Sequence, residues 1–72
     1  MAISYKKLWK LLIDKDMKKG DLEAKAGISH YVVNKLSHDK NVTADILAKI
    51  CVVLECKMDD IMEIIPDEAE AP

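Results

Sequence analysis

Apolar residues recur along most of this chain at the three- and four-residue spacing of an amphipathic helix. The spacing predicts helices from about Tyr5 to Lys15, from about Lys19 to Ala26, from Ser29 to about Ser37, and from Thr43 through Leu54. In the last of these, six apolar residues share one face: Ile46, Leu47, Ile50, Cys51, Val53 and Leu54. We therefore expect the helices to bury one side each in a common core.

Residues that favour helix ends stand at several predicted boundaries. Ser4, Ser29 and Thr43 can each accept a hydrogen bond from a free amide in the first turn of the helix that follows. Gly27 comes directly after the second helix, where the chain must turn sharply, and glycine enters the left-handed conformation without steric penalty. The second and third helices are thus predicted to be joined by a tight turn, as in a helix-turn-helix.

The last part of the chain leaves two conformations open. Asp59 is expected to cap a short fifth element over residues 61–65, which Pro66 ends. A helical turn is the first choice, but a strand paired with residues 2–4 fits the sequence equally well. Residues 67–72 are acidic and have nothing to bury, so we expect a disordered tail. The prediction is an all-α bundle of about five helices in one domain, residues 1–66, with short terminal β pairing as the alternative.

Composition bounds the core and the class of protein. Seventy-two residues suffice for one compact domain, and the only aromatic residues are Tyr5, Trp9 and Tyr31, so the core is predicted to be aliphatic. Leu11 and Ile13, together with Trp9, widen the apolar stripe of the first helix beyond what one packing partner needs. That excess predicts an association surface.

Several functional classes are disfavoured. The sequence has neither a signal-peptide pattern nor an apolar run near the roughly 20 residues of a membrane helix, so we expect a soluble, cytoplasmic protein without membrane contact. Cys51 and Cys56 lack the spacing and partners of a zinc site, and both are expected to be reduced, with Cys51 buried. Ser29 and His30 are neighbours that point in different directions, and no carboxylate is placed to orient the imidazole. We predict no enzyme activity, cofactor or small-molecule substrate.

Charge is divided along the chain. Residues 1–40 hold nine lysines and five acidic residues, a net charge of +4, whereas residues 41–72 hold two lysines and eight acidic residues, a net charge of −6. A positive half facing DNA would attract phosphates while the acidic half points away. The alternative is that the lysines only solvate helix faces.

The third helix carries the residues best suited to a ligand. If Val33 and Leu36 turn inward, the opposite face presents polar side chains that fit the major groove of DNA: His30, Tyr31, Asn34 and Lys35. His30 as a solvated surface residue, and Tyr31 as cover for the edge of the core, remain alternatives.

The sequence resembles the Cro/repressor-like (XRE-type) helix-turn-helix family. The resemblance rests on K-x-D-L-x-x-x-A-G-I-S-x-x-x-V-x-K-L, which begins at Lys19, then V-T-x-x-x-L-x-x-I-C-x-x-L and D-I-M-E, and it covers about Tyr5 to Pro66. It implies a lambda repressor-like bundle of about five helices. The implied function is that of a transcriptional regulator, in the first instance a repressor, that binds a palindromic operator in double-stranded DNA as a homodimer. Glu23 departs from the family pattern, which prefers alanine there, so its side chain is expected to swing outward.

The resemblance also implies roles for individual residues. Lys19 would meet a phosphate, His30, Tyr31 and Lys35 would reach base edges, and the loop after the third helix would touch the DNA backbone. The predicted DNA-contacting residues are Lys18, Lys19, Ser29, His30, Tyr31, Asn34, Lys35, His38, Lys40 and Asn41. The rival function is a protein-interaction module of the same fold, such as an antirepressor or an antitoxin-like partner, which the net charge of −2 and the broad apolar stripe favour.

Overall fold

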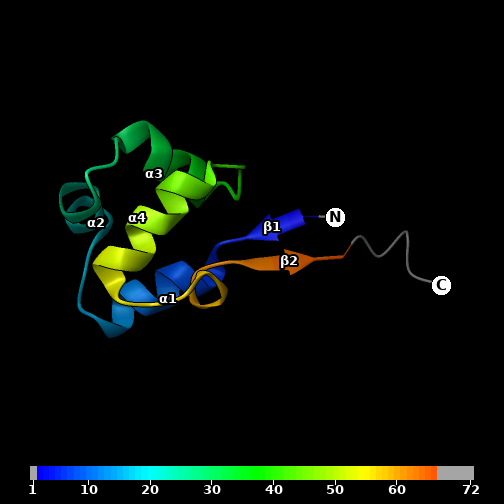
Figure 1. Ribbon diagram of the computed structural model, residues 1–72, viewed down its shortest axis with the longest axis horizontal. Coiled ribbons are helices and arrows are strands. Elements are labelled where there is room, and N and C mark those ends of the chain that lie inside the picture. The colour runs from blue at the N-terminus through cyan, green and yellow to red at the C-terminus, as the bar shows by residue number, and fades with distance from the viewer. Residues whose placement is uncertain (1, 67–72) are drawn as a thin grey trace.

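The computed structural model describes residues 2–66, which form a bundle of four helices and a pair of short strands that projects from it (Figure 1). The tail over residues 67–72, expected to be disordered, lies outside the described residues. The elements in chain order are β1 (Ala2–Ser4), α1 (Lys6–Asp14), α2 (Lys19–Ala26), α3 (His30–Ser37), α4 (Ala44–Leu54), a 3₁₀ turn (Met58–Asp60) and β2 (Glu63–Ile65). The four predicted helices are present.

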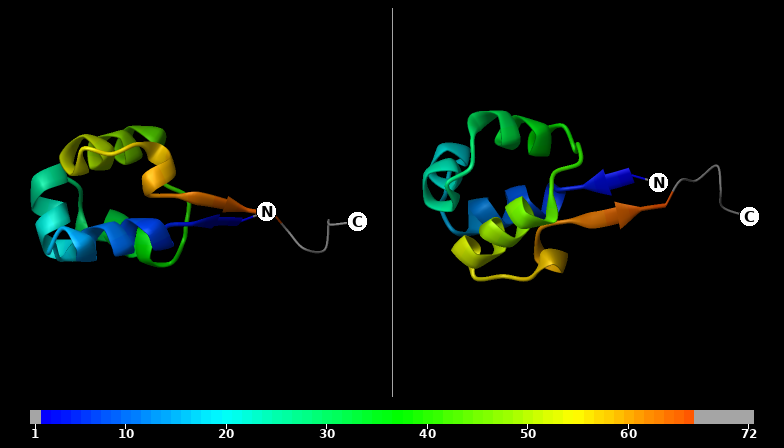
Figure 2. Two further views of the ribbon diagram at one scale, coloured as in Figure 1. Left: turned by 90° about the horizontal axis from the view of Figure 1, so that it is seen from below. Right: turned by 45° about the horizontal axis from the view of Figure 1, so that its top comes forward.

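The fifth predicted helix is absent from the described residues. Its place is taken by the 3₁₀ turn and by β2, which pairs antiparallel with β1 in the register Ala2 to Ile65, Ile3 to Ile64 and Ser4 to Glu63. Both strands extend away from the helices in every view (Figures 1 and 2). The strand alternative is therefore correct for this segment, and two consecutive β-branched residues before a proline favour it over a helix.

Two of the predicted caps are confirmed. The hydroxyl of Ser29 accepts a hydrogen bond from the Val32 amide at 3.2 Å, and the hydroxyl of Thr43 accepts one from the Ile46 amide at 3.3 Å. Each satisfies one of the amides that the first turn of a helix leaves free. These caps fix where α3 and α4 begin.

Of the other two predicted caps, one is confirmed in part and one is wrong. Ser4 belongs to β1, so α1 begins two residues later with Tyr5 as its N-cap, although the Ser4 hydroxyl still accepts a bond from the Lys6 amide at 3.3 Å. At the other end of the chain Asp60, rather than Asp59, closes the 3₁₀ turn, because its Oδ2 accepts a bond from the Lys57 amide at 2.9 Å.

The core is aliphatic apart from Tyr5, as the composition predicts. Every helix contributes to it, and Val52, on the opposite face of α4, is 76% exposed. The buried residues are Tyr5, Leu8, Leu12, Leu22, Ala26, Val33, Leu36, Leu47, Ile50, Leu54 and Ile61. The side of α3 that holds Val33 and Leu36 is therefore sunk into the bundle.

The wide apolar stripe of α1 is mostly used inside the protein. Trp9 and Leu11 are half-buried and pack against the core, which leaves Ile13, 72% exposed, as the apolar residue of this stripe that faces outward. The predicted association surface thus shrinks to one side chain. Cys51 and Cys56 are free thiols, both half-buried, so the full burial expected of Cys51 is not found.

No helix within residues 2–66 has both the length and the apolar character required to cross a membrane.

Candidate nucleic-acid interface

Helices α2 and α3 form a helix-turn-helix, and the turn between them has the predicted geometry. Gly27 adopts the left-handed conformation with φ +65°, and the amides of Gly27 and Ile28 both reach the Glu23 carbonyl. This arrangement satisfies a free carbonyl at the end of α2 and reverses the chain into the Ser29 cap of α3. With the apolar side of α3 fixed inward, its polar side faces outward.

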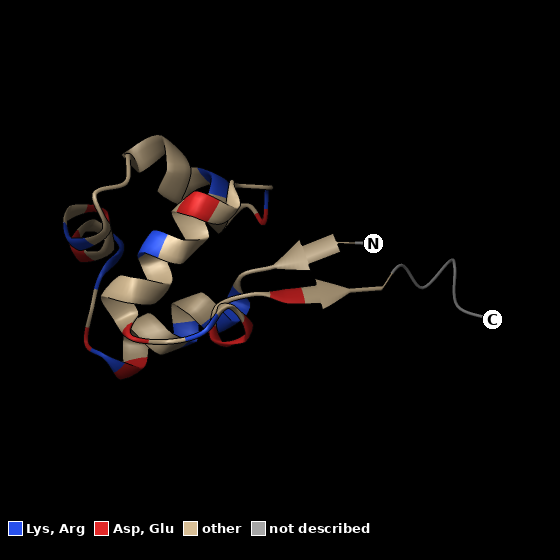
Figure 3. Ribbon diagram, in the orientation of Figure 1, with Lys and Arg blue, Asp and Glu red and all other residues tan. Residues whose placement is uncertain are grey.

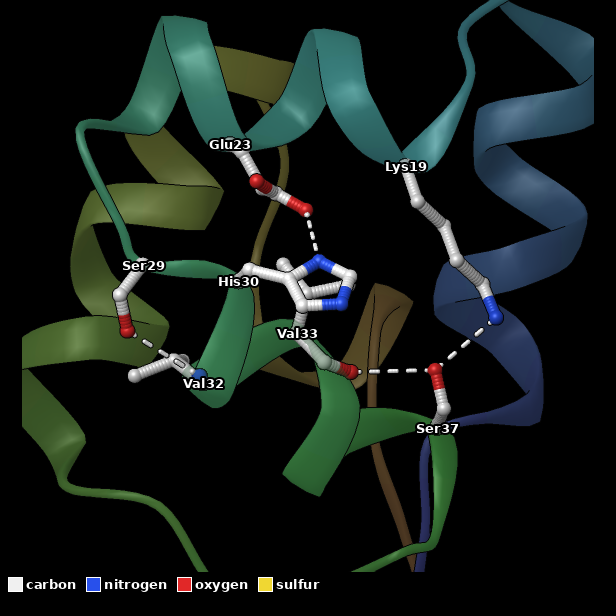
Figure 4. Close-up of polar contacts among 7 residues, drawn as sticks. All are labelled: Lys19, Glu23, Ser29, His30, Val32, Val33 and Ser37. Atoms are coloured by element: carbon white, nitrogen blue, oxygen red, sulfur yellow. Dashed lines mark hydrogen bonds and ion pairs between the residues drawn. The ribbon is translucent and has the colours of Figure 1, made fainter.

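All the residues predicted to contact DNA are exposed except Lys35, which is half-buried. The outer face of α3 has two edges. One edge, with His30 and Ser37, contacts α2 (Figure 4), and the other, with Tyr31 and Lys35, borders the start of α4. The exposed Asn34 is a further polar residue of this helix.

On the α2 edge, the carboxylate of Glu23 contacts the imidazole of His30. The Oε2 atom of Glu23 lies 3.0 Å from Nδ1 of His30, and the two side chains are 26% and 87% exposed (Figure 4). Glu23 therefore does not swing away from α3 as expected, because its carboxylate finds a partner there. The expectation that no carboxylate orients the imidazole is also wrong, since this contact joins residues on two different helices.

Lys19 connects three helices at the same edge. Its ammonium donates a hydrogen bond to the Ser37 hydroxyl at 2.9 Å, and that hydroxyl donates to the Val33 carbonyl at 3.0 Å (Figure 4). The same ammonium lies 4.6 Å from the centre of the Trp9 ring, a cation–π distance. A positive charge is thereby held beside the C-terminal end of α3.

On the α4 edge, Lys35 folds back over Tyr31. Its Nζ atom lies 5.5 Å from the centre of the Tyr31 ring, and Tyr31 is 69% exposed. Both border an open hollow of about 460 Å³ between α3 and the start of α4, which is lined by Tyr31, Val32, Lys35, Asn41, Val42, Thr43 and Ile46. Lys35 thus lies at the edge of the polar face.

The remaining predicted contact residues flank α3. His38 ends the helix, and its Nδ1 lies 2.8 Å from the Asn34 carbonyl. Lys40 and Asn41 follow in the exposed loop that leads to α4. Lys18 stands at the N-cap of α2, where its amide donates to Asp21 Oδ2 at 3.0 Å.

The charge division along the sequence does not become a division between two faces. Lys7, Lys10 and Lys15 share a hollow with Glu55 and Asp60, so positive residues of the first half lie beside acidic residues of the second. Figure 3 shows charges of both signs spread over the helices and loops. Positive charge at α3 comes instead from Lys35 within the helix, from Lys19, which bonds Ser37, and from Lys40 in the loop that follows.

Sequence reasoning missed two residues of this surface, Glu23 and Ser37. Both make their contacts between α2 and α3, so no short motif reveals them. The sequence did offer one hint of the Glu23–His30 contact, because these two residues lie in turns of α2 and α3 that face each other in a helix-turn-helix. Within residues 2–66, no three histidine, cysteine, aspartate or glutamate side chains gather as a metal site requires.

The comparisons agree with this architecture. The model of the Cro/C1-type HTH DNA-binding domain matches residues 7–67. Among solved structures, the chain is similar to the transcriptional regulator VanUg in its crystal form II, with 47% identity, a TM-score of 0.87, and coverage of 92% of this chain and 88% of that one. A search of curated proteins finds no match. The family match spans most of the chain and includes both helices of the motif, and the chain therefore belongs to the Cro/C1-type HTH DNA-binding domain family.

Proposed function

We propose that this protein regulates transcription by inserting α3 into the major groove of a specific duplex DNA sequence. The observation that carries the proposal is the orientation of α3, whose apolar residues Val33 and Leu36 are buried while His30, Tyr31 and Asn34 are exposed. A helix fits the major groove, where each base pair presents a distinct pattern of hydrogen-bonding groups. The similarity to a solved transcriptional regulator supports the same proposal.

The proposed contacts with DNA are of two kinds, contacts to phosphates and contacts to base edges. We assign phosphate contacts, which fix register and orientation, to the exposed lysines Lys18 and Lys19 at the start of α2 and Lys40 after α3. Side chains of α3 then read base edges. Lys35 must unfold from Tyr31 to do so, and the pairing that suits its ammonium best is with guanine.

The proposed regulator acts in the cytoplasm as a homodimer on a palindromic operator. Two copies related by a twofold axis place their α3 helices in successive major grooves, about 34 Å apart along the duplex. Occupation of such a site blocks polymerase, so the proposed outcome is repression.

A protein-interaction module of the same fold is the second candidate, and less now supports it. Its main structural support was the apolar stripe of α1, but Trp9 and Leu11 pack inside the protein. Ile13 and Val52 stay exposed, and single exposed apolar residues are common on protein surfaces.

Selection from random duplexes tests the proposed function. The protein is mixed with the library, bound duplexes are recovered and sequenced, and affinity for the enriched site is measured between 50 and 200 mM salt. We expect an inverted repeat whose half-sites lie about one helical turn apart, and an affinity that falls steeply with salt because bound lysines displace counterions. Absence of any enriched sequence would reject the proposed function.

A further inference from the structure

The hydrogen-bonding character of His30 is set by the neighbouring helix. Its Nδ1 lies 3.0 Å from Oε2 of Glu23, and an ionised carboxylate can only accept a hydrogen bond. Nδ1 must therefore carry the hydrogen. A neutral imidazole has a single N–H, so Nε2 keeps its lone pair and acts as an acceptor.

In the Glu23–His30 pair, the glutamate is fixed between two helices and the histidine is accessible to a ligand. Glu23, 26% exposed, lies between α2 and α3, whereas His30 is 87% exposed and the second nitrogen of its ring points away from Glu23 (Figure 4). A ligand that approaches the outer face of α3 thus reaches Nε2, while Glu23 keeps its contact with Nδ1.

The surroundings of the ring leave Glu23 as its ionic partner. On α2, Lys19 lies one turn before Glu23 on the same side of the helix, and its ammonium is hydrogen-bonded to Ser37. From α1, the side chain that meets this edge is the uncharged Trp9, under the same ammonium. On α3 itself the residues one turn after His30 are Val33 and Asn34, which carry no charge.

The geometry points to a base-reading rule. Glu23 is a positioning residue that directs Nε2 of the neutral His30 ring outward as a hydrogen-bond acceptor, so α3 with a neutral His30 selects a base with an amino group in the major groove, cytosine through N4 or adenine through N6. A second proton on the ring turns Nε2 into a donor, and the preferred partner becomes an acceptor such as N7 or O6 of guanine. The rule rests on the proposed function, because it requires α3 to enter the groove.

Nitrogen NMR of the free protein tests the first step without DNA. At pH 8 the ¹⁵N shifts of the His30 ring should identify Nδ1 as the protonated nitrogen. Glu23→Ala, which places the residue preferred by the wider family at this position, should move the ring toward the Nε2–H form. A wild-type ring protonated at Nε2, or a tautomer unchanged by Glu23→Ala, would overturn the inference whatever the protein binds.

Selection from random duplexes at pH 8 tests the second step. We expect one position in each half-site to favour cytosine or adenine by about tenfold, and this preference should disappear in both Glu23→Ala and His30→Ala. Asp14→Ala is the matched control, since it removes the same charge from the end of α1 and should keep the preference.

The two failures are distinguishable. If wild type and Glu23→Ala enrich operators with the same base at every position, the base-reading rule is wrong while DNA binding stands. If neither enriches any sequence, the proposed function fails and the rule fails with it, and the NMR result still decides the tautomer.

Discussion

The carboxylate of Asp39 accepts a hydrogen bond from the backbone amide of Tyr5, with 3.0 Å between Oδ1 and N. The two residues are 34 positions apart, and their contact ties the loop after α3 to the start of α1. It also gives a partner to the backbone amide of Tyr5, the N-cap residue of α1, whose own side chain makes no cap hydrogen bond. The loop that holds Lys40 and Asn41 is thereby anchored to the bundle.

Asp39→Ala should destabilise the protein by about 1–3 kcal/mol, because it removes a hydrogen bond to a charged acceptor. Asp39 also has φ +54°, a left-handed conformation that alanine adopts less readily than aspartate or asparagine. Asp39→Asn keeps an oxygen acceptor and tolerates this φ, so it should cost less. Urea unfolding measures both, and equal stability of wild type and Asp39→Ala would show that the contact contributes nothing.

Gly27→Ala should cost about 1–2 kcal/mol of folding free energy through backbone strain alone. A Cβ added at Gly27 meets nothing within 4 Å, but the residue has φ +65°. Gly20 is the matched control, since an added Cβ there also meets nothing within 4 Å and the residue lies inside α2. Gly20→Ala should stabilise the protein by about 0.5–1 kcal/mol. Thermal or urea unfolding that ranks the two variants the other way would contradict the assigned turn.

Stability should fall in alkaline solution because two groups resist ionisation in the folded state. Burial, followed by the neighbouring Cys51 and Asp60, raises the pKa of the Cys56 thiol to about 11. Burial and the Asp39 carboxylate raise the pKa of the Tyr5 phenol, against an opposing contact with the Val42 backbone. As pH rises, the unfolded chain therefore loses these protons before the folded protein does. The contribution of these two groups to folding stability is fully present below their pKa values in the unfolded chain, and it is lost as pH rises through their pKa values in the folded protein.

Unfolding free energies measured between pH 8 and 11 test this prediction. Wild type should lose stability from about pH 8.5 upward as unfolded thiol ionises, and more steeply near pH 10 as unfolded phenol does. Cys56→Ala should remove the first part of the decline and Tyr5→Phe the second. A flat profile for wild type over this range would contradict the assigned burial of both groups.

The local signals in the sequence predicted the fold where one residue decides a local conformation. Gly27 specified the turn, Ser29 and Thr43 specified the starts of two helices, and the spacing of Leu47, Ile50 and Leu54 specified the buried face of α4. Each of these depends on neighbours within a few positions. The helix-turn-helix was therefore predictable from the sequence alone.

Contacts between distant segments were less predictable. The pairing of β1 with β2 joins the two ends of the chain, and the sequence of residues 61–65 fits a helix or a strand until that partner is placed beside it. The Glu23–His30 pair, the Lys19–Ser37 bond and the fold of Lys35 over Tyr31 depend on how side chains lie once the helices have packed. The helix-turn-helix motif therefore predicted which surface carries the candidate site, but it did not predict the side-chain contacts within that surface.

The affinity of Lys35→Ala for a selected operator, measured beside its circular dichroism, tests most directly whether the outer face of α3 enters the groove. Lys10→Ala is the control, because Lys10 is an exposed lysine of α1 beside Asp14 and Asp60 and its loss removes the same charge. We predict that Lys35→Ala weakens binding by about 1–3 kcal/mol, that Lys10→Ala binds nearly as wild type does, and that both keep full helicity. Wild-type affinity in Lys35→Ala, or an equal loss in both variants, would contradict the placement of α3 on DNA.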